Sequence, residues 1–194
     1  MINYGFFNTS LGIVLLAVTP RGLCSLRMCE FHGTDVQLAE VKSDFSTTEF
    51  VENTETVQSY ADQLISFLQT PETLFTPTLD ICLGTAFQRE VWAELQKVRP
   101  SETITYTELA ARVGRPLAVR AAASACARNG LAIAIPCHRA VRRDGTLTGF
   151  RWGIPWKKRL LELEADQQLP GITEERQNQV PQGHVPHASA NTSR

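Results

Sequence analysis

The chain has 194 residues, of which 43% are hydrophobic and 20% charged, and its formal net charge is -1. These values are typical of a globular protein with one good-sized core or two small ones. The apolar run at residues 12–18 is too short for a bilayer span and follows no basic segment, so neither export nor membrane insertion is expected.

The first third of the chain predicts a small α/β support domain without catalytic side chains. Strand-like segments separated by polar turns at residues 8–10 and 20–22 predict an antiparallel sheet within residues 2–28. Residues 31–53 are mixed in polarity and predict no element. Apolar positions at helical spacing in residues 54–68 predict an amphipathic helix covering one face of the sheet. We therefore place this domain at residues 1–69 and a linker at residues 70–83.

The second domain, residues 84–168, is predicted to be mainly α-helical. A first helix starts near Gly84 and is ended by Pro100. Thr105 and Glu108 form a capping-box pattern, which predicts that a second helix begins there. A last helix is expected from about Pro155. The polar residues 169–194 that follow predict a disordered tail.

Between these helices the sequence predicts a helix-turn-helix. Gly114 breaks the second helix, and Pro116 suits the first turn of a third helix that ends near Arg128. Residues 111–160 contain eleven lysines and arginines but one acid, Asp144, which indicates a polyanionic partner such as nucleic acid. The alanines of the third helix favour helix in general, and they would also let its backbone enter a narrow groove while Arg120 reaches into the duplex.

Nucleophilic chemistry is predicted at Cys137, which follows the strand-like residues 131–135 and Pro136 and has His138 beside it. A single cysteine is more often an inert core residue, but here the neighbouring residues supply a base. The five cysteines show no framework spacing, so no disulfide and a reducing compartment are expected. Cys24 and Cys29, with His32 nearby, match no common zinc spacing, so we expect no metal and no cofactor.

These features together resemble the O6-alkylguanine-DNA alkyltransferases, which repair methylated DNA by accepting the alkyl group on a cysteine. The resemblance covers residues 84–164 almost continuously, and it is greatest to the C-terminal half of the bacterial adaptive-response regulator. The residues that carry it are Gly84-Thr85-Ala86-Phe87-Gln88, Val91-Trp92, Thr103, Tyr106, Leu109-Ala110, Arg120-Ala121, Ser124-Ala125-Cys126-Ala127, Asn129, Ile135-Pro136-Cys137-His138-Arg139, Gly145, Gly149, Arg151-Trp152-Gly153, Lys157, Leu160-Leu161 and Glu164.

The resemblance implies a role for each of five residues in the chemistry. Cys137 is the alkyl acceptor, His138 is its base through a bridging water, and Glu164 orients the histidine. Tyr106 donates a hydrogen bond as the guanine leaves, and Asn129 ties the third helix to the thiol segment. A thiolate is needed for in-line displacement, and a donor aimed at the leaving base lowers the barrier. The thioether product cannot be reversed by thiol exchange, so each molecule is expected to react once.

The resemblance also implies the binding surfaces and the substrate. Arg120 is expected to replace a flipped nucleotide in the minor groove, and flipping costs a few kcal/mol. The other implied DNA contacts are Thr103, Arg115, Ala118, Ala121 and Ser124. The implied substrate pocket consists of Tyr106, Val141, Phe150, Arg151 and Trp152. The bulk of Trp152 favours small alkyl groups over benzyl-sized ones.

The implied first domain is ribonuclease-H-like, and the implied partner is double-stranded DNA carrying alkylated guanine, bound by a monomer. Gly130 stands where the family often has proline, which leaves the rigidity of that loop open. The expected location is the cytoplasm of a prokaryote or the nucleus of a eukaryote. Two alternatives remain: a helix-turn-helix protein that binds lesions without chemistry, and a cysteine hydrolase, which would need a distant histidine and an oxyanion site.

Overall fold

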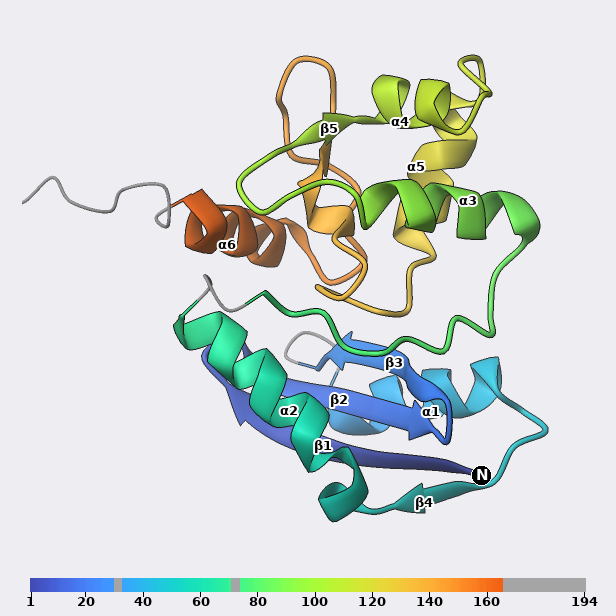
Figure 1. Ribbon diagram of the computed structural model, residues 1–194, viewed down its shortest axis with the longest axis vertical. Helices are drawn as coiled ribbons and strands as arrows, with labels where there is room; N and C mark the ends of the chain where they lie inside the picture. The colour runs from blue at the N-terminus through green and yellow to red at the C-terminus, as the bar shows by residue number, and fades with distance from the viewer. Residues whose placement is uncertain (30–32, 71–73, 166–194) are drawn as a thin grey trace, which may run out of the picture.

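The computed structural model describes residues 1–29, 33–70 and 74–165 and has two layers: a four-stranded sheet with its two covering helices, and a second group of helices (Figure 1). Strands β1 (Ile2–Thr9), β2 (Gly12–Thr19) and β3 (Gly22–Met28) form the predicted antiparallel meander. Strand β4 (Phe50–Glu52) pairs in parallel with β1, so the strand order is β3-β2-β1-β4. Strand β3 is therefore an edge strand.

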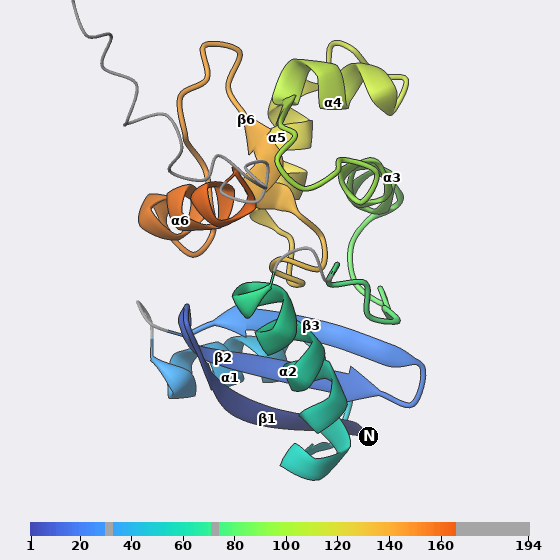
Figure 2. The same cartoon turned by 60° about the vertical axis from the view of Figure 1, so that its left-hand side comes forward.

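Both faces of this sheet are covered by helices (Figure 2). Helix α2 (Thr54–Gln69) confirms the predicted amphipathic helix and packs on the face that carries Val14 and Leu16. Helix α1 (Thr34–Asp44) covers the face that carries Leu15 and Ala17. The sequence predicted neither α1 nor β4. The reason for α1 is its weak apolar pattern, since its buried residues are Gln37 and Val41.

The second layer contains helices α3 (Ala86–Leu95), α4 (Tyr106–Arg112), α5 (Val119–Ala127) and α6 (Ile154–Ala165). A short 3-10 helix, η1 (Cys137–Arg139), lies beside a two-stranded parallel sheet of β5 (Ile104–Thr105) and β6 (Ala140–Val141). The capping box at α4 is confirmed: the Glu108 amide donates to Thr105 Oγ1 over 3.1 Å, and the Thr105 amide donates to Glu108 Oε2 over 2.8 Å.

Two predicted helix boundaries and one strand-like segment of this layer were wrong. The first helix of this layer ends at Leu95, before Pro100. Helix α5 starts at Val119, and Pro116 lies before it rather than in its first turn, because the backbone between Arg115 and Ala118 closes a separate turn. Residues 131–135 are not a strand: Leu131 forms an isolated bridge with Leu26, and the chain then turns.

The edge strand β3 joins the two layers. The segment predicted as a linker runs along one part of it, where Leu23 forms a bridge with Leu79. Further along, the Leu26 amide donates to the Gly130 carbonyl and the Ala132 amide donates to the Leu26 carbonyl, each over 3.0 Å. One hydrophobic core extends from α2 along the face of the sheet that carries Val14 and Leu16 to the helices of the second layer. The sheet therefore supports the segment that leads to Cys137.

Some of the sequence expectations concern residues outside the described ranges. The predicted tail from residue 169 and His32 both lie there. Within the described ranges, no helix is both long enough and apolar enough to cross a membrane. Nor do those ranges hold any group of three or more histidine, cysteine or acidic side chains that could bind a metal ion.

Candidate active site

Cys137 is the first residue of η1, and its thiol is buried beside an asparagine. The side chain of Asn129 donates from Nδ2 to Cys137 Sγ over 3.1 Å and to the Ile135 carbonyl over 2.8 Å. Its Oδ1 accepts from the Leu131 amide over 2.9 Å. Asn129 follows α5 closely, so one amide group fixes the loop between that helix and the thiol.

The surroundings of Cys137 keep the thiol protonated at neutral pH. Burial raises the pKa of Cys137 to about 11, although the Asn129 hydrogen bond and the positive charges of Lys157 and Arg151 act in the opposite direction. A thiolate is the nucleophilic form, so this sulfur needs a base that removes its proton when a reaction begins.

His138, the residue after Cys137, forms a buried pair with Glu164. The distance from His138 Nε2 to Glu164 Oε1 is 2.8 Å, and both side chains are 0% exposed. Burial lowers the pKa of His138, so the imidazole is neutral. An ionised carboxylate can only accept, which places the imidazole proton on Nε2 and leaves Nδ1 as an acceptor. Among the described residues, His138 Nδ1 has no hydrogen-bond partner, so it is available as a base.

Arg139 keeps Glu164 ionised. Its Nε and Nη2 donate to the Glu164 carboxylate, with the Nη2 to Oε1 distance at 2.7 Å, and its Nη1 donates to the Val98 carbonyl. Burial alone would raise the pKa of Glu164, but the hydrogen bonds from His138 and Arg139, together with the positive charge of Arg139, outweigh it and lower the pKa to about 2. The motif at residues 135–139 thus contributes a thiol, a base and the cation that holds the orienting carboxylate.

A lysine without a role in the sequence analysis completes the site. Lys157 of α6 is fully buried and donates from Nζ to the carbonyls of Ala140 and Thr148. It also lies 3.5 Å from the Tyr106 hydroxyl, which donates to the Thr148 carbonyl over 3.1 Å. The signal was present in the sequence: Lys157 precedes Glu164 by seven residues, which puts both on one helix face.

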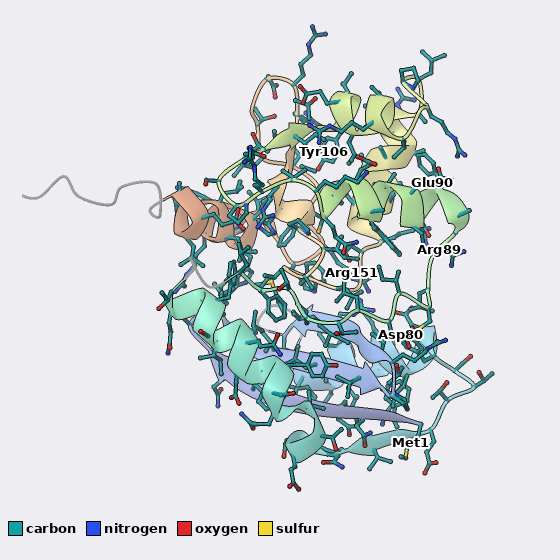
Figure 3. The ribbon with its side chains drawn as sticks, viewed as in Figure 1. Met1, Asp80, Arg89, Glu90, Tyr106 and Arg151 are labelled. Carbon is teal, nitrogen blue, oxygen red and sulfur yellow. The ribbon has the colours of Figure 1, made fainter. Side chains whose placement is uncertain are left out.

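Tyr106 stands at the start of α4, where Figure 3 labels it, and its hydroxyl contacts the loop at residues 148–153, which carries three of the predicted pocket residues and is called the pocket loop below. A side-chain carbon at Gly149 would lie 3.6 Å from the Tyr106 hydroxyl, so the loop passes close to that hydroxyl. Burial raises the pKa of Tyr106 to about 12, with the neighbouring thiols adding to the shift. The hydroxyl is therefore a hydrogen-bond donor at neutral pH.

The rest of the predicted pocket is brought together around this loop. Phe150 and Trp152 pack edge to face with ring centroids 5.2 Å apart, and Trp152 is 1% exposed. Val141 is buried in β6, where it pairs with Thr105. Arg151, which lies between the two rings in sequence, binds Glu40 of α1.

Most of the predicted DNA contacts are exposed, and they lie on α5 or in the segments before α4 and α5. Helix α5 buries Ala122, Ala125 and Cys126, while Trp92 of α3 donates from Nε1 to the Ala125 carbonyl over 2.9 Å. The opposite side carries the predicted residues Arg120, Ala121 and Ser124, all exposed, with the half-buried Ala118 next to them. Thr103 is exposed before β5, whereas Arg115 lies over the Phe87 ring and pairs with Glu90 at 3.4 Å.

Comparison with known proteins places this arrangement in a family. A family model described as "6-O-methylguanine DNA methyltransferase, DNA binding domain" matches residues 86–166. A methylated-DNA--protein-cysteine methyltransferase of Mycolicibacterium paratuberculosis is 35% identical over 164 residues, which are 84% of this chain and 93% of the relative. The chain belongs to the methylated-DNA--protein-cysteine methyltransferase family.

Relatives of other lengths and solved structures agree with this membership. The bifunctional transcriptional activator/DNA repair enzyme Ada of Escherichia coli is 41% identical over 85% of this chain and 46% of the relative, so the chain spans about half of that protein. The O6-methylguanine methyltransferase of Mycobacterium tuberculosis superimposes with a TM-score of 0.70 at 31% identity, covering 88% of this chain and 96% of the other. A crystal structure of that organism's OGT in complex with DNA gives 0.73 at 33% identity, covering 85% and 94%.

Proposed function

We propose that this chain repairs double-stranded DNA by transferring an alkyl group, above all methyl, from O6-alkylguanine to Cys137, and that O4-alkylthymine is a second substrate. The observation that carries the proposal is the buried thiol beside a neutral imidazole whose Nε2 is held by Glu164 and whose Nδ1 is free to accept a proton. The family's name and the DNA complex of a structural relative support it.

The proposed reaction is an in-line displacement at the alkyl carbon. The thiol proton of Cys137 passes through a water to His138 Nδ1, the sulfur–carbon bond forms, and the carbon–O6 bond breaks. The electron pair of that bond stays on the guanine, which takes up one proton in place of the alkyl group; His138 gives back through the water the proton that it accepted from the thiol, and the imidazole is neutral again. Tyr106, with its pKa raised to about 12, stabilises the developing charge as a donor, and Lys157 holds its hydroxyl in place. The thioether is permanent, so one molecule repairs one lesion.

We also propose how the DNA is bound. Helices α4 and α5 act as a helix-turn-helix whose exposed surface enters the minor groove, with Arg120 filling the space of the flipped nucleotide. In this complex Thr103, Ala118, Ala121 and Ser124 face the DNA backbone, and Arg115 contacts the DNA backbone from beside Phe87.

The protein works as a monomer, and its first domain belongs to the ribonuclease-H-like group. It acts where the DNA is, in the cytoplasm of a prokaryote or the nucleus of a eukaryote.

Intact mass after mixing with a duplex that contains O6-methylguanine tests the central step. We expect a gain of one methyl group, about 14 Da, that stops at one equivalent and is absent in Cys137→Ala. A lesion that stays bound with no gain in mass would indicate a binding protein without chemistry. Repeated loss of lesions by unmodified protein would indicate a turnover enzyme such as a hydrolase.

A second prediction concerns the size of the alkyl group. The rings of Phe150 and Trp152 pack against each other in the pocket loop, and the Trp152 residue is only 1% exposed, so little space is left beside them. We expect O6-methylguanine in DNA to react at least about ten times faster than O6-benzylguanine in the same duplex, because overpacking a filled site costs roughly 1–3 kcal/mol. Single-turnover rates with the two duplexes measure this ratio, and equal rates would contradict it.

A further inference from the structure

An ion-pair network connects the first domain to the pocket loop. Helix α1 presents Glu40 and Asp44 one turn apart. Asp44 Oδ2 binds Nη2 of Arg27, a β3 residue, at 2.5 Å, and Glu40 Oε2 binds Arg151 Nη2 at 2.7 Å. The same Glu40 oxygen lies 3.8 Å from Arg27 Nη1, so the two pairs form one network. Figure 3 labels Arg151 where the helical layer faces the sheet.

Arg27 is an unusual residue for the interior of a sheet domain. It is 1% exposed, and its Nη1 makes no hydrogen bond within the described residues. Burial lowers its pKa, and the charge of Arg151 adds to this effect. Proteins in which an apolar side chain of similar volume replaces a buried ion pair are often no less stable. The stability of the fold alone therefore does not account for a buried guanidinium here.

The same guanidinium also lies against Gly130, in the loop between α5 and η1. A side-chain carbon at Gly130 would lie 3.1 Å from Arg27 Nη2, and the Gly130 carbonyl accepts from the Leu26 amide. Gly130 directly follows Asn129, which binds the thiol. This contact explains why glycine, where the family often has proline, fits this chain: the guanidinium occupies the space that a ring would need.

The other end of the network fixes the loop over Tyr106. Arg151 stands between Phe150 and Trp152 in the chain. Its bond to Glu40 therefore helps to fix the part of the loop that carries these two packed rings. Glu40 and Arg151 are 39% and 28% exposed as side chains, so this pair alone is weak and sensitive to salt. The buried Arg27, which Asp44 binds, adds a second positive charge 3.8 Å from the same Glu40 oxygen and so helps to hold Glu40 in place.

We propose that Glu40 and Arg27 are positioning residues for the alkylated base: through Arg151 they hold the pocket loop over Tyr106, so the first domain sets the preference for lesion-containing DNA. This inference rests on the proposed function, since it concerns the same pocket. Neither residue contributes an atom to the thiol, imidazole and carboxylate group.

The test uses equilibrium binding in the Cys137→Ala background, where no transfer can occur. The ratio measured is the affinity for O6-methylguanine duplex divided by the affinity for unmodified duplex. We expect Glu40→Gln to reduce this ratio by about five- to tenfold, because a loosened loop loses contacts with the alkylated base but not with the rest of the DNA. Asp35→Asn is the matched control: it removes the same charge from the same helix, where Asp35 is exposed and lies in the first turn. General attraction to DNA changes equally in both variants and cancels in the ratio.

Two further measurements make the result decisive. Amide hydrogen exchange of residues 149–153 is expected to be faster in Glu40→Gln than in Asp35→Asn, without any DNA present. The double variant Glu40→Gln with Arg151→Met should lower the affinity ratio no more than Arg151→Met alone, because both changes act through one bond. Unchanged exchange and an unchanged ratio in Glu40→Gln, or additive effects in the double variant, would overturn the inference. Failure of methyl transfer in the mass experiment would instead refute the proposed function and leave these two measurements valid.

Discussion

Replacing Glu164 by glutamine is expected to slow alkyl transfer to Cys137 by roughly a hundredfold and to lower the free energy of unfolding by about 3–5 kcal/mol. The carboxylate binds His138 Nε2 and Arg139 inside the protein, where all three side chains are buried. An amide carries no charge to compensate Arg139, and its NH2 group can donate to Nε2. The imidazole proton would then move to Nδ1, so His138 would no longer accept from the thiol.

Glu162→Gln is the matched control for this prediction. It makes the same substitution on the same helix, where the Glu162 side chain is 60% exposed and lies 3.6 Å from Lys158. Exposed pairs of this kind contribute little, so the control should fold and react like the wild type. Urea unfolding and single-turnover transfer measure the two effects. Equal behaviour of the two variants would mean that Glu164 neither compensates Arg139 nor orients the histidine.

The stability effect of Glu164 is expected to depend on pH in a defined direction. Its pKa falls from 4.5 to about 2 in the folded protein, so the folded state favours the ionised form. This contribution, about 3 kcal/mol, is fully present above pH 4.5 and is lost as the pH falls towards 2. The difference in unfolding free energy between wild type and Glu164→Gln should therefore shrink below pH 4.5. A constant difference would contradict the assignment.

Local patterns in the sequence were sufficient for some parts of the fold and the site. The capping box at Thr105 and Glu108 predicted the start of α4, because its two hydrogen bonds join residues three positions apart. The meander of β1 to β3 followed from short polar turns between apolar segments. Cys137 and His138 are adjacent in sequence, so both could be proposed as site residues without knowledge of the tertiary structure.

Contacts between residues far apart in the sequence could not be predicted from local patterns. Glu164 entered only through the family resemblance, since 26 residues separate it from His138. The burial of Lys157 depends on carbonyls of β6 and the pocket loop, which the composition of α6 does not specify. The network around Arg27 joins residues more than a hundred positions apart, and α1, which carries Glu40, has too weak an apolar pattern to be predicted.

Asn129→Asp is expected to slow alkyl transfer by about a hundredfold at neutral pH while nearly preserving the shape of the side chain. The amide donates to Cys137 Sγ and to the Ile135 carbonyl, and its Oδ1 accepts from the Leu131 amide. A carboxylate retains the last bond but loses both donors and places a negative charge 3.1 Å from the sulfur. Like charges repel, so the pKa of Cys137, already raised to about 11, should rise further.

Reaction with iodoacetamide, followed at the Cys137 peptide by mass, separates the thiol effect from DNA binding. We expect the pH dependence of this reaction to shift upward in Asn129→Asp, since fewer sulfurs are ionised at each pH. Asn53→Asp is the control, because Asn53 accepts from the Thr56 amide at the start of α2 and an aspartate accepts there equally well. If the thiol reacts normally in Asn129→Asp while alkyl transfer still fails, the amide acts by shaping the loop between α5 and η1. If both reactions are slow, its hydrogen bond stabilises the thiolate itself.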